Sequence, residues 1–254
     1  MNHDTPYSLK GKTAVITGGG SGIGRSIAKC FSIAGAKVIL IGRNEANLQE
    51  ACQAVFGDAH YFVQNITVLH ELPNLVRQIE VDHGEVAILV NNAGVHLKKS
   101  AKEVTDSEFE NIMKTHVGAA FALSREFGKR MCERGSGHIL FIASMASLFG
   151  IPMVSAYSAA KSAHLGLVRS LAADFSPEGV RVNAIAPGWI HSKMMHSALE
   201  SDPERKNKIL GRTPLGDFGH PEDIGWAATF LSSPAARFIT GVCLPVDGGA
   251  SVGF

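Results

Sequence analysis

The chain has 254 residues, which is enough for one large domain or two small ones. Hydrophobic residues make up 45% of the chain and charged residues 19%, so it can bury a sizeable core without disulfides or metal ions. The formal net charge of +1, with no long run of like charges, argues against a general nucleic-acid-binding surface.

Short β-branched segments alternate with longer amphipathic segments along the chain. In chain order, this pattern predicts a strand at 13–17, a helix at 23–34, a strand at 37–41, a helix at 45–55, a strand at 60–63, a helix ending near Asp82, a strand at 86–90, one long helix at about 106–134, a strand at 138–143, a helix at 155–175, a strand at 180–186, a loop-and-helix insertion at about 188–220, a helix at 222–231 and a strand near 242–246. Strands that are apolar on both faces, each followed by a helix, are typical of a parallel sheet covered on both sides. With right-handed crossovers, the expected fold is a single α/β domain over 1–254, built on a doubly wound parallel seven-stranded sheet.

Ligands of a doubly wound sheet bind beyond the carboxyl ends of its strands. After the first expected strand stands Thr17-Gly18-Gly19-Gly20-Ser21-Gly22-Ile23-Gly24. Glycines let the backbone approach a pyrophosphate closely, and the N-terminus of the next helix supplies free N–H groups. The spacing is not GxGxxG, however, and a flexible connecting loop is the alternative. Asn91-Asn92-Ala93-Gly94, after the fourth strand, is by itself also explained by a turn.

A serine, a tyrosine and a lysine occupy positions that favour proton transfer. Ser144 ends the fifth expected strand, and Tyr157 and Lys161 stand four residues apart on the next helix, so they share one helical face. A nearby cation lowers the pKa of a phenol, and such a phenol can donate a proton to a carbonyl oxygen or accept one from an alcohol. Surface residues of an amphipathic helix are the alternative interpretation.

Taken together, these motifs resemble the short-chain dehydrogenase/reductase family over essentially the whole chain. They are TGGGSGIG at 17–24, NNAG at 91–94, the Ser144/Tyr157/Lys161 set, Pro187-Gly188 and VDGG at 246–249, in family order and spacing. The resemblance implies a Rossmann-type fold that binds NAD(H) or NADP(H), with Tyr157 as catalytic acid/base. It also implies that Lys161 holds the nicotinamide ribose and lowers the tyrosine pKa, that Ser144 orients the substrate oxygen, and that Asn91 helps to fix its strand end.

The resemblance further implies a set of cofactor-binding residues. Besides Tyr157 and Lys161, they are Gly18, Ser21, Gly22, Ile23, Gly24, Arg43, Asn65, Ile66, Asn92, Ala93, Gly94, Pro187, Gly188, Ile190 and Ser192. Ser192 stands where the family usually has a threonine that binds the carboxamide. Asn65 replaces an aspartate that often lies beside the adenine, and it keeps an acceptor and a donor.

His116 is the main departure from the family pattern. The family has an asparagine there, whose backbone carbonyl anchors a water in the proton relay. A histidine keeps that carbonyl, so we expect an intact relay with His116 as a fourth catalytic residue. The alternative is that His116 only fills space in a helix kink.

The end of the second strand predicts NADP(H) in preference to NAD(H). A carboxylate there would bind the adenosine ribose and repel a 2′-phosphate, but the chain has Gly42 followed by Arg43. Arginine suits phosphate through its planar fork of donors, although an exposed arginine opening a helix is a common alternative. Arg25, in the first helical turn, is a second candidate cation.

The substrate is expected to contact 94–99, 145–155 and 188–213. These segments hold cationic or titratable residues, namely His96, Lys98, Lys99, His191, Lys193 and Arg212, which would favour a sugar acid if they turn inward. They also hold apolar residues suited to amphipathic ligands, namely Met145, Leu148, Phe149, Met153, Trp189, Met194 and Met195. The segments are similar to gluconate 5-dehydrogenase-like members and to 3-oxoacyl-thioester reductases, and both alternatives stay open.

The resulting hypothesis is a metal-free carbonyl reductase or alcohol dehydrogenase that acts on a small-molecule polyol, sugar acid or oxoacyl compound. A catalytically silent NADP-binding regulator is the alternative from another class. Four widely spaced cysteines, without a CxxC pair, favour a reducing compartment. With no signal-peptide core and no apolar run long enough to cross a bilayer, we expect a cytoplasmic protein with no membrane or nucleic-acid partner. The resemblance and the apolar helix at 155–175 favour a homotetramer.

Overall fold

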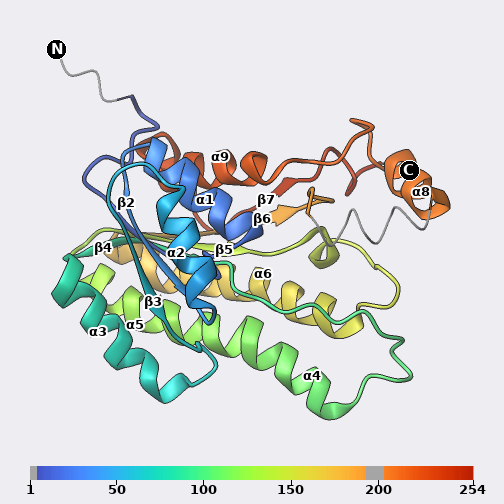
Figure 1. The fold of residues 1–254 in the computed structure, drawn as a ribbon, viewed down its shortest axis with the longest axis horizontal. Coiled ribbons are helices and arrows are strands. Elements are labelled where there is room, and N and C mark those ends of the chain that lie inside the picture. Colours follow the sequence, from blue (N-terminus) through green and yellow to red (C-terminus); the bar gives the residue numbers. More distant parts are fainter. Residues whose placement is uncertain (1–4, 193–202, 254) are drawn as a thin grey trace.

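The computed structural model describes residues 5–192 and 203–253, and its centre is one parallel sheet (Figure 1). The strands are β1 (Thr13–Thr17), β2 (Lys37–Gly42), β3 (Ala59–Val63), β4 (Val86–Asn91), β5 (Gly137–Ile142), β6 (Val180–Pro187) and β7 (Cys243–Val246). They lie in the order β3-β2-β1-β4-β5-β6-β7, and every neighbouring pair is parallel. The predicted doubly wound seven-stranded sheet is therefore confirmed.

Helices cover both faces of the sheet. They are α1 (Gly22–Ile33), α2 (Glu45–Gln53), α3 (Leu72–His83), α4 (Asp106–Met113), α5 (Ala119–Glu133), α6 (Ser155–Phe175), α8 (Pro203–Arg212) and α9 (Pro221–Ser232). One core joins the sheet to α1, α2 and α9, and the other joins it to α3, α5 and α6 (Figure 1). The inner strands β1, β4 and β5 are buried on both sides, which explains why these segments read as continuous apolar runs.

The strand order reverses at β1, which pairs with β2 on one side and β4 on the other. Connections leave the sheet in opposite directions at such a point, so the segments after β1 and β4 diverge and leave a crevice at the carboxyl ends of the strands. The glycine loop and the NNAG segment both start there. No helix in the described parts of the chain is long and apolar enough to cross a membrane.

The helix expected at about 106–134 is found at 106–133, but it is not one uninterrupted α-helix. The structure divides it into α4, a π-helical turn at Lys114–Gly118, and α5. A π turn inserts an extra residue, which shifts the backbone out of the α-helical register and is often found at functional sites. Here tertiary contacts decide the local geometry, because the side chain and the carbonyl of His116 both bond outside the helix. The other predicted boundaries differ from the observed ones by at most two residues, and those of β1 and α6 are the same.

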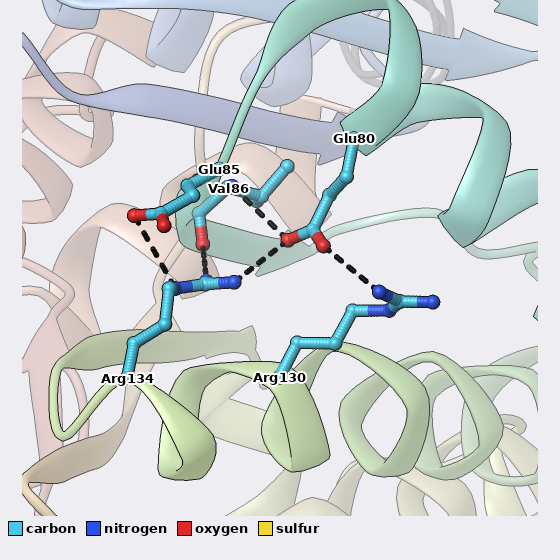
Figure 2. Close-up of polar contacts among 5 residues, drawn as sticks. All are labelled: Glu80, Glu85, Val86, Arg130 and Arg134. Carbon is cyan, nitrogen blue, oxygen red and sulfur yellow. Dashed lines mark hydrogen bonds and ion pairs between the residues drawn. The ribbon is translucent and has the colours of Figure 1, made fainter.

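At the other end of the sheet, where the strands begin, a partly buried cluster of ion pairs joins α3 to α5 (Figure 2). Glu80 accepts hydrogen bonds from Arg130 at 3.2 Å and from Arg134 at 3.0 Å. Arg134 also donates to the carbonyl of Val86 at 2.7 Å, and the Val86 N–H donates to Glu80 at 3.2 Å. Since backbone and side chains share these bonds, the start of β4 is fixed to the helix layer.

Candidate active site

The loop between β1 and α1 and the first turn of α1 are packed so tightly that Gly18 and Gly24 have no room for a side chain. Gly18 has a φ of +65°, and a Cβ there would lie 2.9 Å from the Cα of Ala93. A Cβ at Gly24 would lie 2.3 Å from the carbonyl oxygen of Gly18 and 2.5 Å from the side-chain nitrogen of Asn92. The loop therefore lies directly against the segment that follows β4. No side chain caps α1 at its start, so a phosphate could take the N–H groups of its first turn.

Thr17, the last residue of β1, ties the ends of β1 and β4 together. Its hydroxyl accepts hydrogen bonds from the N–H groups of Asn92 and Ala93, each at 3.0 Å, and donates to the carbonyl of Val90 at 3.2 Å. In return, the Asn92 amide donates to the carbonyls of Thr17 at 2.9 Å and Gly18 at 3.2 Å. Sequence reasoning did not assign this role to Thr17. The available signal was a hydroxyl at the last position of a fully buried strand.

A cleft of about 660 Å³ opens at this switch point. Seven of the predicted cofactor-binding residues line it, namely Gly18, Ser21, Arg43, Asn65, Ile66, Ala93 and Gly94. It is also lined by polar residues that the sequence did not single out, namely Asn44, Asn47, Gln64, Thr67, Asn111 and Thr115. A glycine cradle for phosphate, joined to a long polar cleft, fits a dinucleotide. The walls thus suit the implied cofactor.

Arg43 is exposed at the rim of this cleft, directly after β2. Within the described residues, no side chain or backbone group forms a hydrogen bond or ion pair with it. Its guanidinium is therefore available to a ligand in the cleft. Arg25, the other candidate cation, is already engaged, because it donates to Glu50 at 2.8 Å.

The predicted residues after β6 are not among those that line the cleft. The Gly188 N–H donates to the carbonyl of Val246 at 3.0 Å, and a Cβ at Gly188 would lie 2.5 Å from the Cα of Asp247. Only glycine therefore fits this close approach of the β6 and β7 ends. Ile190 forms a parallel bridge with Gly219, which closes the base of the insertion, and Ser192 is exposed just beyond it.

Ser144, Tyr157 and Lys161 come together where β5 ends and α6 begins. Ser144 and Lys161 are buried, with 9% and 4% of their surface exposed, and Tyr157 is half-buried. The Tyr157 phenol lies close to the Ser144 hydroxyl. The Lys161 Nζ lies 5.8 Å from the centroid of the tyrosine ring. The structure therefore brings a phenol, a hydroxyl and an amine to one place, as the helical spacing predicts.

The pKa of Tyr157 does not follow the expectation that Lys161 lowers it. Burial raises the pKa of Tyr157 above its ordinary value, and the neighbouring Ser144 hydroxyl opposes that rise only in part. Lys161 points its Nζ at the carbonyl of Ile142, at 2.5 Å, and burial lowers the pKa of Lys161 to about 7. The lysine is thus only partly charged near neutral pH. An oxygen-rich ligand beside its Nζ would favour the charged form.

His116 lies in the π-helical turn and contacts the site on two sides. Its ring stands edge-on to Tyr157, with centroids 5.5 Å apart, and its Nε2 is 2.7 Å from the carbonyl oxygen of Val95. A Cβ at Gly94 would lie 2.3 Å from the His116 ring, so this imidazole connects the cleft to the tyrosine. The His116 carbonyl accepts a hydrogen bond from Nε2 of His164 at 2.9 Å. One lone pair remains for the expected water.

One residue on the substrate side lies directly against Tyr157. The His96 ring centroid is 5.2 Å from that of the tyrosine. The loop that carries His96 is anchored at Lys99, whose N–H donates to the carbonyl of Met153 at 2.7 Å and whose Nζ lies 2.9 Å from Glu108. Lys99 is therefore a structural tie, and His96 is held in place beside the phenol.

Several other residues that were expected to contact the substrate can be located in the structure. Arg212, at the end of α8, lies with its guanidinium 4.2 Å from the ring centroid of Phe149, and so joins the insertion to the loop after β5. The ring of His191 lies tilted against that of His220, with centroids 4.7 Å apart, and Lys98 is exposed. Met145 is buried at 4% exposure, which removes it from the substrate-facing set. Lys193, Met194 and Met195 lie outside the described residues.

Known proteins resemble this chain along almost its whole length. A family model described as enoyl-(acyl carrier protein) reductase matches residues 18–251. Galactitol 2-dehydrogenase (L-tagatose-forming) of Cereibacter sphaeroides is 39% identical over 255 residues, covering 99% of this chain and all of that protein. The 2-dehydro-3-deoxy-D-gluconate 5-dehydrogenase of Bacillus subtilis is 37% identical and covers 97% of each chain.

A further relative and a solved structure also align with nearly the whole chain. A 3-oxoacyl-(acyl-carrier-protein) reductase of Rickettsia prowazekii is 36% identical, covering 95% of this chain and 97% of that protein. Among solved structures, a protein of Beutenbergia cavernae assigned as an NAD(P)-dependent gluconate 5-dehydrogenase, with NADP bound at low occupancy, superposes with a TM-score of 0.90. It is 40% identical and covers 97% of this chain and 99% of its own.

Proposed function

The chain belongs to the short-chain dehydrogenase/reductase family, and on that premise we propose that it interconverts a ketone and a secondary alcohol on a sugar acid or polyol, using NADP(H). Membership of this family makes it an NAD(P)-dependent oxidoreductase that acts on CH–OH groups. The observation that carries the proposal is the meeting of Ser144, Tyr157 and Lys161 beside the cleft, with His116 in contact with both Tyr157 and Gly94 of the cleft wall.

Each side chain has a distinct proposed role. The bound nicotinamide supplies or accepts the hydride. Tyr157 gives a proton from its phenol to the carbonyl oxygen, or takes one from the alcohol. Ser144, whose hydroxyl lies close to that phenol, orients the same substrate oxygen, and Lys161 returns a proton to the phenol. All three groups are at least half-buried. The proton therefore moves between groups that are shielded from bulk water.

The sugar-acid or polyol preference is supported by polar groups at the mouth of the site. His96 lies against Tyr157, and Arg212 is held over Phe149 at the end of the insertion. An imidazole and a guanidinium can bind hydroxyl and carboxylate groups of a short polar substrate. Relatives that act on galactitol and on 2-dehydro-3-deoxy-D-gluconate support the same class. A 3-oxoacyl thioester is the second candidate, favoured by the Rickettsia relative and by the partly exposed Leu148 and Met153.

A substrate panel tests this proposal directly. We would follow NADPH and NADH oxidation by the purified protein with keto sugar acids, keto sugars and 3-oxoacyl thioesters. We expect the highest kcat/KM with a keto sugar or keto sugar acid. A clear preference for thioesters would replace the proposed substrate class with the second candidate. Tight NADPH binding without turnover of any member would contradict the proposed reaction.

The NADP preference makes a prediction at Arg43. Arg43→Ala should weaken NADPH binding by about 10- to 100-fold, because one charge-assisted bond to the 2′-phosphate contributes roughly 1.5–3 kcal/mol. NADH affinity should change less than about threefold, since NADH lacks that phosphate. Dissociation constants from fluorescence titration check this, with Arg25→Ala as the matched control because Arg25 is already paired with Glu50. Equal losses for both cofactors would show that Arg43 does not select NADP.

We also propose a cytoplasmic homotetramer. All four cysteines are unpaired, which fits a reducing compartment. Phe109 of α4 and Phe121 of α5 are 42% and 40% exposed, so the helix layer that contains them offers apolar area for contact between subunits. Light scattering after size-exclusion chromatography should give four times the 27.0 kDa mass of one chain. The mass of a monomer would contradict this assembly.

A further inference from the structure

Helix α6 carries a third titratable side chain, that of His164, on the face that holds Tyr157 and Lys161. His164 follows Tyr157 by seven residues and Lys161 by three, and these spacings place all three on one side of an α-helix. The His164 side chain is 2% exposed and lies 5.3 Å from the ring of Phe141, measured between centroids.

His164 binds the π-helical turn that carries His116. Its Nε2 lies 2.9 Å from the His116 carbonyl oxygen, across 48 positions in sequence. His116 is held on its other side by Val95, through its ring Nε2. The turn is therefore fastened between α6 and the loop after β4, and the His116 ring between them packs edge-on against Tyr157.

The geometry fixes the tautomer of His164. A carbonyl oxygen can only accept a hydrogen bond, so the Nε2 of His164 must carry the proton and its Nδ1 must hold a lone pair. That Nδ1 is buried without a hydrogen-bond partner. Burial, followed by the nearby Lys161 charge, lowers the pKa of His164 to about 3, so the imidazole stays neutral and keeps this bond throughout the working pH range.

His164 also shares a neighbour with Lys161. The Ile142 carbonyl accepts a hydrogen bond from the Lys161 Nζ at 2.5 Å, and the same carbonyl raises the pKa of His164, which places it beside the imidazole. Removal of the imidazole would therefore loosen two contacts at once, namely the π turn against α6 and the packing around the carbonyl that holds the lysine.

We propose that His164 is a positioning residue, which ties the π-helical turn to α6 and so holds Tyr157, between the His116 ring and Lys161, in the geometry for proton transfer. The proposal rests on the proposed function, because it concerns the same reaction. His164 does not touch the substrate in this scheme. It acts through His116 and through the shared Ile142 carbonyl.

Two substitutions test the tether. His164→Leu fills the space but cannot donate to the His116 carbonyl, whereas His164→Gln can place an amide N–H near the position of Nε2. We expect His164→Leu to lower kcat by about 10- to 100-fold, as a misplacement of about 1 Å would, with KM and NADPH affinity changed less than about threefold. We expect His164→Gln to recover kcat to within about threefold of the parent, and the pH profile of kcat to shift only in the leucine variant.

Hydrogen–deuterium exchange gives a readout that does not depend on turnover. In His164→Leu, the amides of Lys114–Gly118 should exchange at least about tenfold faster than in the parent, while those of β1 stay protected. If the leucine variant does not fold, His164→Asn replaces it, because the shorter amide cannot reach the carbonyl. His138→Gln is the matched control, since His138 is an equally buried histidine bonded to Ser232 and Asn183, away from the site.

The outcomes separate this proposal from the proposed function. An inactive parent would contradict the proposed function, but faster exchange in the variant would still support the tether. An active parent whose leucine variant keeps kcat, pH profile and exchange would overturn the role of His164. A glutamine variant as impaired as the leucine variant would overturn it as well, because the hydrogen bond would then not be the cause.

Discussion

Replacement of Tyr157 by phenylalanine should lower kcat by about two to four decades, with cofactor affinity unchanged. The substitution removes only the phenol oxygen, which is the group placed to exchange a proton with the substrate. The ring would still pack between His96 and His116, at centroid distances of 5.2 Å and 5.5 Å, so the fold of the site should persist. Steady-state kinetics and NADPH titration on the same preparation check both parts.

A second tyrosine offers a matched control. Tyr61 donates from its hydroxyl to Glu45 at 3.0 Å on the protein surface, so Tyr61→Phe also deletes one hydrogen-bonded phenol oxygen. We expect kcat in this variant to stay within about twofold of the parent, since surface substitutions rarely have larger effects. Full activity in Tyr157→Phe would remove Tyr157 from the mechanism, whatever the control gives.

Replacement of Lys161 by methionine should also lower kcat by at least about two decades, yet it should not destabilise the fold. The lysine is 4% exposed, and burial lowers its pKa to about 7 from 10.5. The unfolded chain therefore binds a proton between pH 7 and 10.5 that the folded chain has lost, so this group makes stability rise with pH in that window. Methionine fills a similar volume without a charge to bury.

Thermal unfolding without cofactor checks the sign of this effect. The melting temperature of Lys161→Met should equal or exceed that of the parent at pH 7, and its advantage should shrink toward pH 10. Lys29→Met is the control, because Lys29 is 46% exposed and lies 3.8 Å from Glu222. A melting temperature well below the parent at pH 7, with the control unchanged, would show that the Lys161 bond to Ile142 stabilises the fold more than its burial costs.

Much of the fold follows from the sequence because its patterns are local. Strands such as β1 and β4 are runs of apolar residues between glycine-rich or polar segments, and the pairing of Tyr157 with Lys161 follows from helical spacing alone. The glycine loop could be placed for the same reason, since a strand, several glycines and a helix follow one another directly. These features depend on neighbouring residues in the sequence and not on contacts between distant ones.

Other features could not be predicted because distant residues decide them. The segment 114–118 has no residue that forbids an α-helix, and it becomes a π turn in a place where His116 bonds to Val95 and His164. The spacing of Lys161 from Tyr157 can be seen in the sequence, but the bond of Lys161 to the Ile142 carbonyl depends on the docking of α6 on β5. The substrate is the least predictable part, since the segments expected to contact it hold both cationic and apolar side chains, and the sequence does not show which of them turn inward.

The arrangement along α6 also limits how this protein can vary. An α-helix turns by about 100° per residue, so insertion or deletion of one residue between Tyr157 and His164 would rotate everything beyond it away from the site. The tyrosine, the lysine and the histidine would then no longer face β5 together, even though each residue type were kept. Length changes should therefore be excluded from this helical segment in functional homologues. They should accumulate in the insertion between Ile190 and Gly219, outside α8, because a changed length there leaves the register of α6 intact.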